Sequence, residues 1–160
     1  MTTSRFTVMG LTACAFFAIP ALAADAGVYP LLNGGQSVTK PASEFQFKGF
    51  GAKGVDPKTE IQVSNVFGDF ATGQHGAFFT FTVGFVSPVH SHTYDYYAVV
   101  IKGVLENFEL GVAPVKLGPG SYWYQVGKKA HTTSCVSKTP CEIFIVQAQK
   151  FDAQIPPVEK

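Results

Sequence analysis

Two places in the sequence carry histidines whose type and spacing could hold a metal ion. His90 and His92 are separated by one residue, and His131 follows later in the chain. Because side chains alternate across a strand, an H-x-H pair places both imidazoles on one face, where a third ligand from a neighbouring strand can join them. Neutral imidazole suits most first-row metals, so we predict one divalent transition metal without distinguishing Zn, Fe, Mn, Ni or Cu.

Two residues just after the pair are candidates to complete or support this centre. Strand parity places Tyr96 on the face of the histidines and Asp95 on the opposite face, unless a bulge intervenes. We leave both open, either as a fourth ligand or as hydrogen-bonding neighbours of the ligands. The remaining histidine, His75, lies between glycines, and we expect it to be exposed in a loop.

The elements that must position these residues read as strands. From Ile61 onward, short apolar or alternating runs are separated by Gly and Pro, and the 15 Phe and 6 Tyr of the chain favour strands over helices. Several short strands must close into a sandwich, jelly roll or barrel to bury one face of each, so the expected fold class is all-β. Alternating aromatic residues could line a pocket there, namely Phe79, Phe81, Tyr122 and Tyr124.

The spacing around the first histidine pair resembles the first motif of the cupin superfamily, G-x5-H-x-H-x(3,4)-E-x6-G. Gly84, His90, His92 and Gly103 stand at its fixed positions, and Tyr96 takes the place of the metal-binding glutamate. This departure puts the fourth ligand of the cupin pattern in doubt.

The second cupin motif, G-x5-P-x-G-x2-H-x3-N, is matched less completely. Gly120 and His131 fall on its glycine and histidine, whereas Val126 replaces its proline and Cys135 replaces its asparagine. The runs 88–103 and 117–125 resemble, more narrowly, the ChrR-like cupins, which include many exported bacterial proteins. The resemblance extends over residues 65–152.

That resemblance implies a single cupin domain, a conical β-barrel or jelly roll with a metal in its interior. We place the barrel at residues 61–152, between an N-terminal arm at 24–60 and a C-terminal tail at 153–160. By analogy with cupins that pair through barrel edges and arms, we expect a homodimer.

The N-terminus is typical of a secretory signal peptide. Arg5 precedes an apolar run, and Ala21-Leu22-Ala23 precedes the expected cleavage, so residues 1–23 are taken out of the fold. A lipid anchor at Cys14 is the less favoured alternative. We expect a periplasmic or secreted protein with no membrane contact beyond export, in which Cys135 and Cys141 form a disulfide across a Pro-containing turn.

Charge and composition narrow the partners. Lys and Arg total 12 against 11 acidic residues, with no basic cluster, which argues against nucleic acid and favours a small-molecule ligand or substrate. The sequence is compatible with a small metalloenzyme acting on a small neutral or aromatic molecule, or with a non-catalytic metal-binding or sensing module. Asp95 is the one evident general base in the motifs, so the sequence does not decide between them.

Overall fold

The computed structural model describes residues 36–50 and 61–158, and β-strands dominate this part of the chain. The expected signal peptide, Cys14 and much of the expected N-terminal arm lie outside these residues. The described elements are η1 (Ala42–Glu44), β1 (Lys48–Gly49), β2 (Gln62–Gly68), β3 (His75–Phe81), β4 (Tyr96–Lys102), β5 (Leu105–Glu109), β6 (Tyr122–Gln125), β7 (His131–Cys135) and β8 (Cys141–Gln147).

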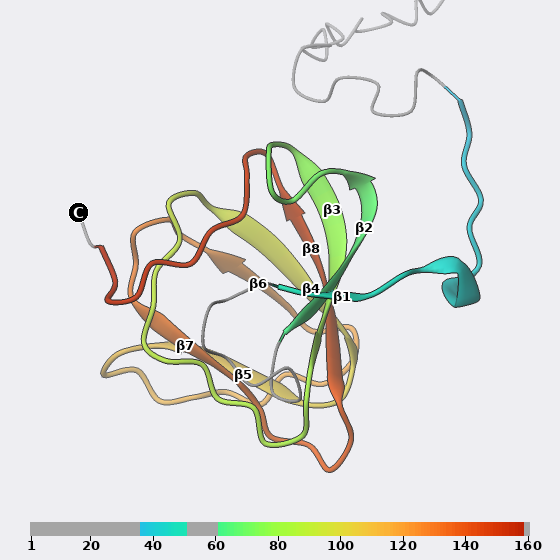
Figure 1. The fold of residues 1–160 in the computed structure, drawn as a ribbon. Coiled ribbons are helices and arrows are strands. Elements are labelled where there is room, and N and C mark those ends of the chain that lie inside the picture. Colours follow the sequence, from blue (N-terminus) through green and yellow to red (C-terminus); the bar gives the residue numbers. More distant parts are fainter. Residues whose placement is uncertain (1–35, 51–60, 159–160) are drawn as a thin grey trace, which may run out of the picture. The chain divides into compact units, whose positions relative to one another are not determined.

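The strands form two antiparallel sheets that face each other (Figure 1). The larger sheet has the order β1-β2-β3-β8-β4-β6, and the smaller one pairs β5 with β7. The all-β class predicted from the short apolar runs and the aromatic content is confirmed, and the two facing sheets agree with the jelly roll that the resemblance implied. None of the described residues belongs to a helix long and apolar enough to span a membrane.

Alternation along the central strands builds the core between the sheets. In β4, Tyr96, Ala98 and Val100 are buried while the residues between them are exposed, and in β8 Ile143 and Ile145 are buried while the residues beside them are half-buried. Each of these two strands therefore turns one apolar face inward, as a two-layer β domain requires.

The segment between β3 and β4 crosses from the large sheet to the small one. Isolated bridges join Val86 to Ser134 and His90 to His131, which places this segment beside β7. On its other side, Ser91 bridges Gln154 near the C-terminus. The H-x-H pair is therefore held between β7 and the C-terminal residues.

The predicted disulfide joins the end of β7 to the start of β8, through Cys135 and Cys141. The prediction of an exposed His75 is wrong, because this residue begins β3 and is fully buried. Its ring packs edge-on against Phe70 and Phe151.

Candidate metal centre

Three histidines from two segments converge in the interior. His90, His92 and His131 each offer a ligand nitrogen, and these atoms all lie within 4.8 Å of one another. The ring centroids are separated by 4.3 Å between His90 and His131, 4.9 Å between His90 and His92, and 5.1 Å between His92 and His131. All three side chains are buried, so the structure brings together the residues predicted to hold the metal.

Backbone pairing sets the relative positions of the two segments. His90 and His131 exchange two backbone hydrogen bonds, at 3.1 and 2.9 Å. Just before β7, the N–H of Lys128 donates to the His92 carbonyl at 2.7 Å. Lys128 has a positive φ of 61°. The bridge therefore aligns the H-x-H segment with the start of β7.

Each of the three rings is oriented by a main-chain carbonyl. Nδ1 of His90 lies 2.9 Å from the carbonyl oxygen of Pro88, and Nδ1 of His131 lies 3.0 Å from that of Lys129. Nδ1 of His92 bonds to the main-chain carbonyl oxygen of Asp152. A carbonyl oxygen can only accept, so each Nδ1 must carry the hydrogen. The neutral tautomer that results leaves the Nε2 lone pair of each ring available to a metal.

Burial keeps these imidazoles neutral. Desolvation is the main cause that lowers the pKa of His92 to about 3 and of His131 to about 4, and it also lowers the pKa of His90. The neighbouring histidines add to the effect for His92 and His131, since a second positive charge nearby is unfavourable. Neutral imidazole is the form that ligates a metal ion.

The donor set fits a divalent transition metal. Nε2 of His131 is buried and has no hydrogen-bond partner among the described residues, although buried polar atoms are nearly always paired. Three neutral nitrogen donors that converge, with tautomers already set, match the ligand chemistry of Zn, Fe, Ni or Cu. An ion would satisfy the atom that the protein leaves unpaired.

The two residues considered as a fourth ligand, Asp95 and Tyr96, have different surroundings in the structure. Asp95 does not join the histidine group, because its carboxylate accepts hydrogen bonds from Tyr124 at 2.5 Å and from the Gly127 N–H at 2.6 Å. Tyr96 is buried beside His92, with 5.1 Å between ring centroids. Its hydroxyl accepts a hydrogen bond from Trp123 Nε1 at 3.4 Å, and burial raises its pKa, which disfavours a phenolate ligand.

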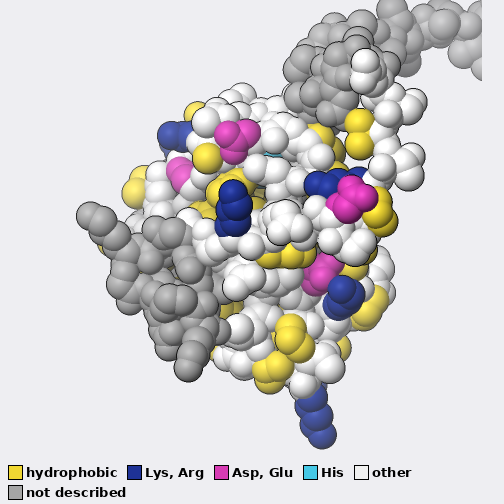
Figure 2. Space-filling model, turned by 45° about the vertical axis from the view of Figure 1, so that its right-hand side comes forward, with side chains coloured by type: hydrophobic (Ala, Val, Ile, Leu, Met, Phe, Trp, Pro, Cys, Tyr) yellow, Lys and Arg dark blue, Asp and Glu magenta, His cyan; other side chains and the backbone are white. Residues whose placement is uncertain are grey.

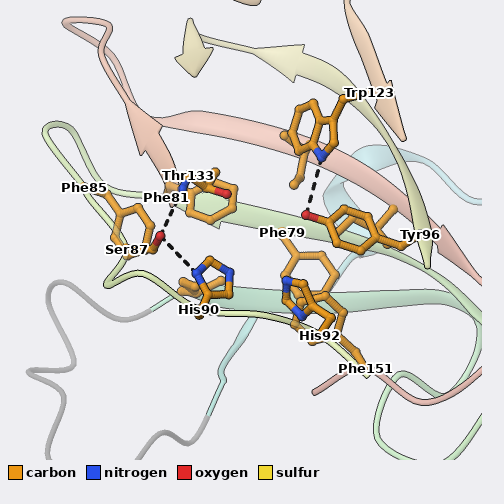
Figure 3. Close-up of a pocket in the computed structure, with 13 residues that line it drawn as sticks. Phe79, Phe81, Phe85, Ser87, His90, His92, Tyr96, Trp123, Thr133 and Phe151 are labelled. Carbon is orange, nitrogen blue, oxygen red and sulfur yellow. Dashed lines mark hydrogen bonds between the residues drawn. The ribbon is translucent and has the colours of Figure 1, made fainter. Parts of the chain in front are cut away.

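A pocket lies directly beside His90 and His92 (Figure 3). It has a cavity volume of about 40 Å³, and its wall is mostly aromatic and aliphatic. Ser87 contributes a hydroxyl that accepts from the Thr133 N–H at 2.9 Å and lies 3.3 Å from His90 Nδ1. The described lining residues are Ile61, Phe79, Phe81, Phe85, Ser87, His90, His92, Tyr96, Trp123, Thr133, Ile143, Ile145 and Phe151.

Of the four aromatic residues predicted to line a pocket, the structure places Phe79 and Phe81 in its wall and Tyr122 and Tyr124 outside it. These two tyrosines are 57% and 43% exposed on the outer face of β6, where their rings lie near Tyr97. The residue between them, Trp123, faces the pocket instead. Alternation was recognised correctly, but the opposite face of the strand is the one that packs inward.

Sequence reasoning missed the contributions of the chain's end. Phe151 lines the pocket and packs against His92 at a tilt, with 4.8 Å between ring centroids, and Asp152 supplies the carbonyl that orients the same ring. No periodic pattern marks this segment, so nothing in its composition pointed to the site.

Comparison with solved structures identifies the fold. An RmlC-like cupin from Ralstonia eutropha matches with a TM-score of 0.59 and 13% identity, covering 82% of this chain and 81% of that one. The polyketide cyclase RemF from Streptomyces resistomycificus matches with a TM-score of 0.57 and 16% identity, covering 78% and 85%. A cupin-2 domain protein from Rhodospirillum rubrum matches with a TM-score of 0.54 and 13% identity, covering 74% and 79%.

At these identities the likeness shows the fold alone. No curated protein sequence matches the chain significantly. The family whose sequence profile matches residues 54–141 is described as a domain of unknown function, DUF4437. This match extends over more than half of the chain, so the protein belongs to the DUF4437 family and has a cupin fold.

Proposed function

We propose that the protein is a metal-dependent cupin in which His90, His92 and His131 hold one divalent transition metal, and that it is a small metalloenzyme acting on a small neutral molecule. The observation that carries this proposal is the set of three buried, backbone-oriented imidazoles whose ligand nitrogens lie within 4.8 Å of one another. A bound ion would supply Lewis-acid or redox chemistry to a ligand in the adjoining pocket.

The protein's own residues define what could enter that pocket. Among its described lining residues there is no lysine, arginine or carboxylate, so apart from the proposed metal ion no charged group would pair with an ionic substrate. Ser87, Thr133 and Tyr96 supply hydroxyl groups that could orient a neutral polar molecule. The remainder of the wall is apolar.

The size of the cavity limits the substrate further. Its volume of about 40 Å³ is well below the roughly 150 Å³ of an engineered protein cavity that binds benzene. We therefore favour a molecule of a few non-hydrogen atoms, or the small neutral end of a larger one, over the aromatic substrate considered from the sequence.

One observation favours a second candidate, a non-catalytic binding or sensing module. Asp95, the general base that the sequence suggested, is engaged with Tyr124 and Gly127 and does not line the pocket. Proton transfer would then depend on Ser87, Tyr96 or the histidines themselves. The polyketide cyclase among the structural neighbours supports the enzyme reading only at the level of the fold.

Export, a ChrR-like affiliation and a homodimer are further parts of the proposal. The disulfide between Cys135 and Cys141 supports an oxidising compartment such as the periplasm or the exterior. Charged side chains of both signs are interspersed on the face shown in Figure 2, where histidine is almost hidden. This distribution agrees with a small-molecule partner better than with nucleic acid.

Metal analysis of the purified protein tests the central claim. We expect about one equivalent of a transition metal per chain in the wild type and almost none in a His90→Ala, His92→Ala double variant. His75→Gln is the matched control, because it removes a buried imidazole that lies outside the cluster and should leave the metal content unchanged. A wild type that stays empty after metal is supplied would refute the proposal.

A further inference from the structure

The end of the described chain, residues 151–158, is bonded along the segment that carries the H-x-H pair (Figure 1). Ser91 and Gln154 exchange backbone hydrogen bonds at 3.2 and 2.8 Å. The fully buried Ser91 hydroxyl also donates to the Val158 carbonyl at 3.1 Å and accepts from the Val158 N–H at 2.9 Å. This C-terminal segment therefore pairs with residue 91, midway between the two histidines.

Asp152 makes the bonds closest to a proposed metal ligand. Its carbonyl oxygen accepts from Nδ1 of His92, and its carboxylate accepts from the N–H of Thr93 at 2.8 Å and from the Thr93 hydroxyl at 2.5 Å. One residue thus holds both the His92 ring and the backbone directly after it. Gln154 adds a donor to the same hydroxyl at 2.9 Å.

Packing of Phe151 also holds the His92 ring in place. The ring of Phe151 lies 4.8 Å from the His92 ring and 4.9 Å from the Phe79 ring, measured between centroids. Its backbone N–H donates to the Phe70 carbonyl at 2.7 Å, which anchors the segment to the turn between β2 and β3. The start of the C-terminal segment is therefore held by this turn and by the rings of His92 and Phe79.

His92 differs from the other two members of the cluster in its source of orientation. His90 and His131 bond to carbonyls only two residues earlier in the chain, whereas His92 bonds to a carbonyl 60 residues away. The bonds of His90 and His131 can form as soon as the few residues around each histidine are folded. The bond to His92 exists only while the C-terminal segment is docked.

We propose that Asp152 is the positioning residue of the metal centre, and that its carboxylate, by holding Thr93, keeps its own carbonyl against His92 Nδ1. This inference rests on the proposed function for its effect on metal affinity. Its structural part, that Asp152 sets the tautomer of His92, stands independently of any metal.

The test compares Asp152→Ala with the wild type in the full chain, by two measurements. Titration with Co²⁺ followed by visible absorbance should show affinity reduced about 10- to 100-fold, the usual cost of losing a group that orients a ligand. In the metal-free protein at neutral pH, long-range ¹H–¹⁵N correlation spectra of the imidazoles should show His92 changing from the Nδ1–H form to a mixture of tautomers. Asp152→Asn, which keeps one carboxamide oxygen as acceptor, should recover part of both effects.

Asp69→Ala is the matched control. Asp69 makes the same kinds of bond within its own turn, to the Ala71 N–H at 3.0 Å and to the Thr72 hydroxyl at 3.2 Å, and it lies outside the histidine group. It should leave Co²⁺ affinity and the His92 tautomer unchanged. If Asp152→Ala also leaves both unchanged, the inference is overturned. If the wild type takes up no metal, the proposed function fails, and the tautomer of His92 alone decides the role of Asp152.

Discussion

The phenol of Tyr124 donates a hydrogen bond to Oδ2 of Asp95 at 2.5 Å, on the opposite side of the strands from the histidine cluster. The other oxygen of the same carboxylate accepts from the Gly127 N–H at 2.6 Å. Asp95 thereby ties β6 to the turn that leads into β7, so the carboxylate nearest to the H-x-H pair in sequence has a structural partner away from the pocket.

This contact predicts a delayed ionisation of Tyr124. The hydrogen bond to Asp95 and the nearby negative charge raise the pKa of Tyr124 to about 12. Spectrophotometric titration at alkaline pH, taken as the difference between wild type and Tyr124→Phe, should show one tyrosine ionising there. In Asp95→Asn the same difference should move back toward 10, and an unchanged midpoint would contradict the role assigned to Asp95.

Metal removal should lower thermal stability. A ligand that binds the folded chain alone stabilises it by about 2.7 kcal/mol at 100 times its Kd. For a chain of this length that gain corresponds to roughly 5–10 °C in Tm, since about 2–4 °C accompany each kcal/mol. Calorimetry with and without a chelator should show this difference in the wild type. The His90→Ala, His92→Ala variant should show none.

His75 should make the metal-free protein less stable in mild acid. Burial lowers its pKa from 6.5, although the Gly73 and Gln149 carbonyls and the charge of Asp69 partly oppose the shift. Below pH 6.5 the unfolded chain then binds more protons than the folded one, so the free energy of unfolding falls as pH falls.

The measurement is urea denaturation from pH 7.5 down to about 5, where His75→Gln should lose part of the slope, by up to about 1.4 kcal/mol per pH unit. The histidines of the cluster contribute in both proteins and cancel in the comparison. Parallel curves for wild type and variant would show that His75 is not buried as a neutral ring.

Removal of the disulfide should destabilise the fold without affecting the metal centre. The bridge closes a loop with a sequence separation of 6, so replacing Cys135 and Cys141 by serine should cost about 2 kcal/mol in denaturant unfolding. Co²⁺ affinity should change less than about twofold, because neither sulfur belongs to the histidine group. A large loss of affinity would show that the end of β7 supports the site more than its contacts indicate.

The histidine cluster was accessible from sequence because its determinants are local. The spacing of His90 and His92 and the parity of a strand are sufficient to predict a shared face, and the motif spacing relates them to His131. Alternation does not, however, say which face of a strand is inside. In β6, Trp123 and Gln125 are buried and the flanking tyrosines are exposed, a choice made by packing against β4 and the small sheet.

Two other features could not be predicted because they depend on distant contacts. Gly76 suggested a loop around His75, yet it lies within β3, where an added Cβ would collide with the rings of Phe67 and Phe144. That glycine reflects close packing. Likewise, the contacts of Phe151 and Asp152 with His92 join segments about 60 residues apart, for which the sequence carries no periodic signal.

The carbonyls that orient His90 and His131 are close to them in sequence, whereas the one that orients His92 is distant, and this affects the order in which the site can form during synthesis. His90 and His131 can acquire their tautomers as soon as their own neighbours are folded, since Pro88 and Lys129 precede them by two residues. His92 must wait for Asp152, which is synthesised 60 residues later. A nascent chain that has not yet emerged as far as Asp152 therefore lacks the contact that orients the His92 ring.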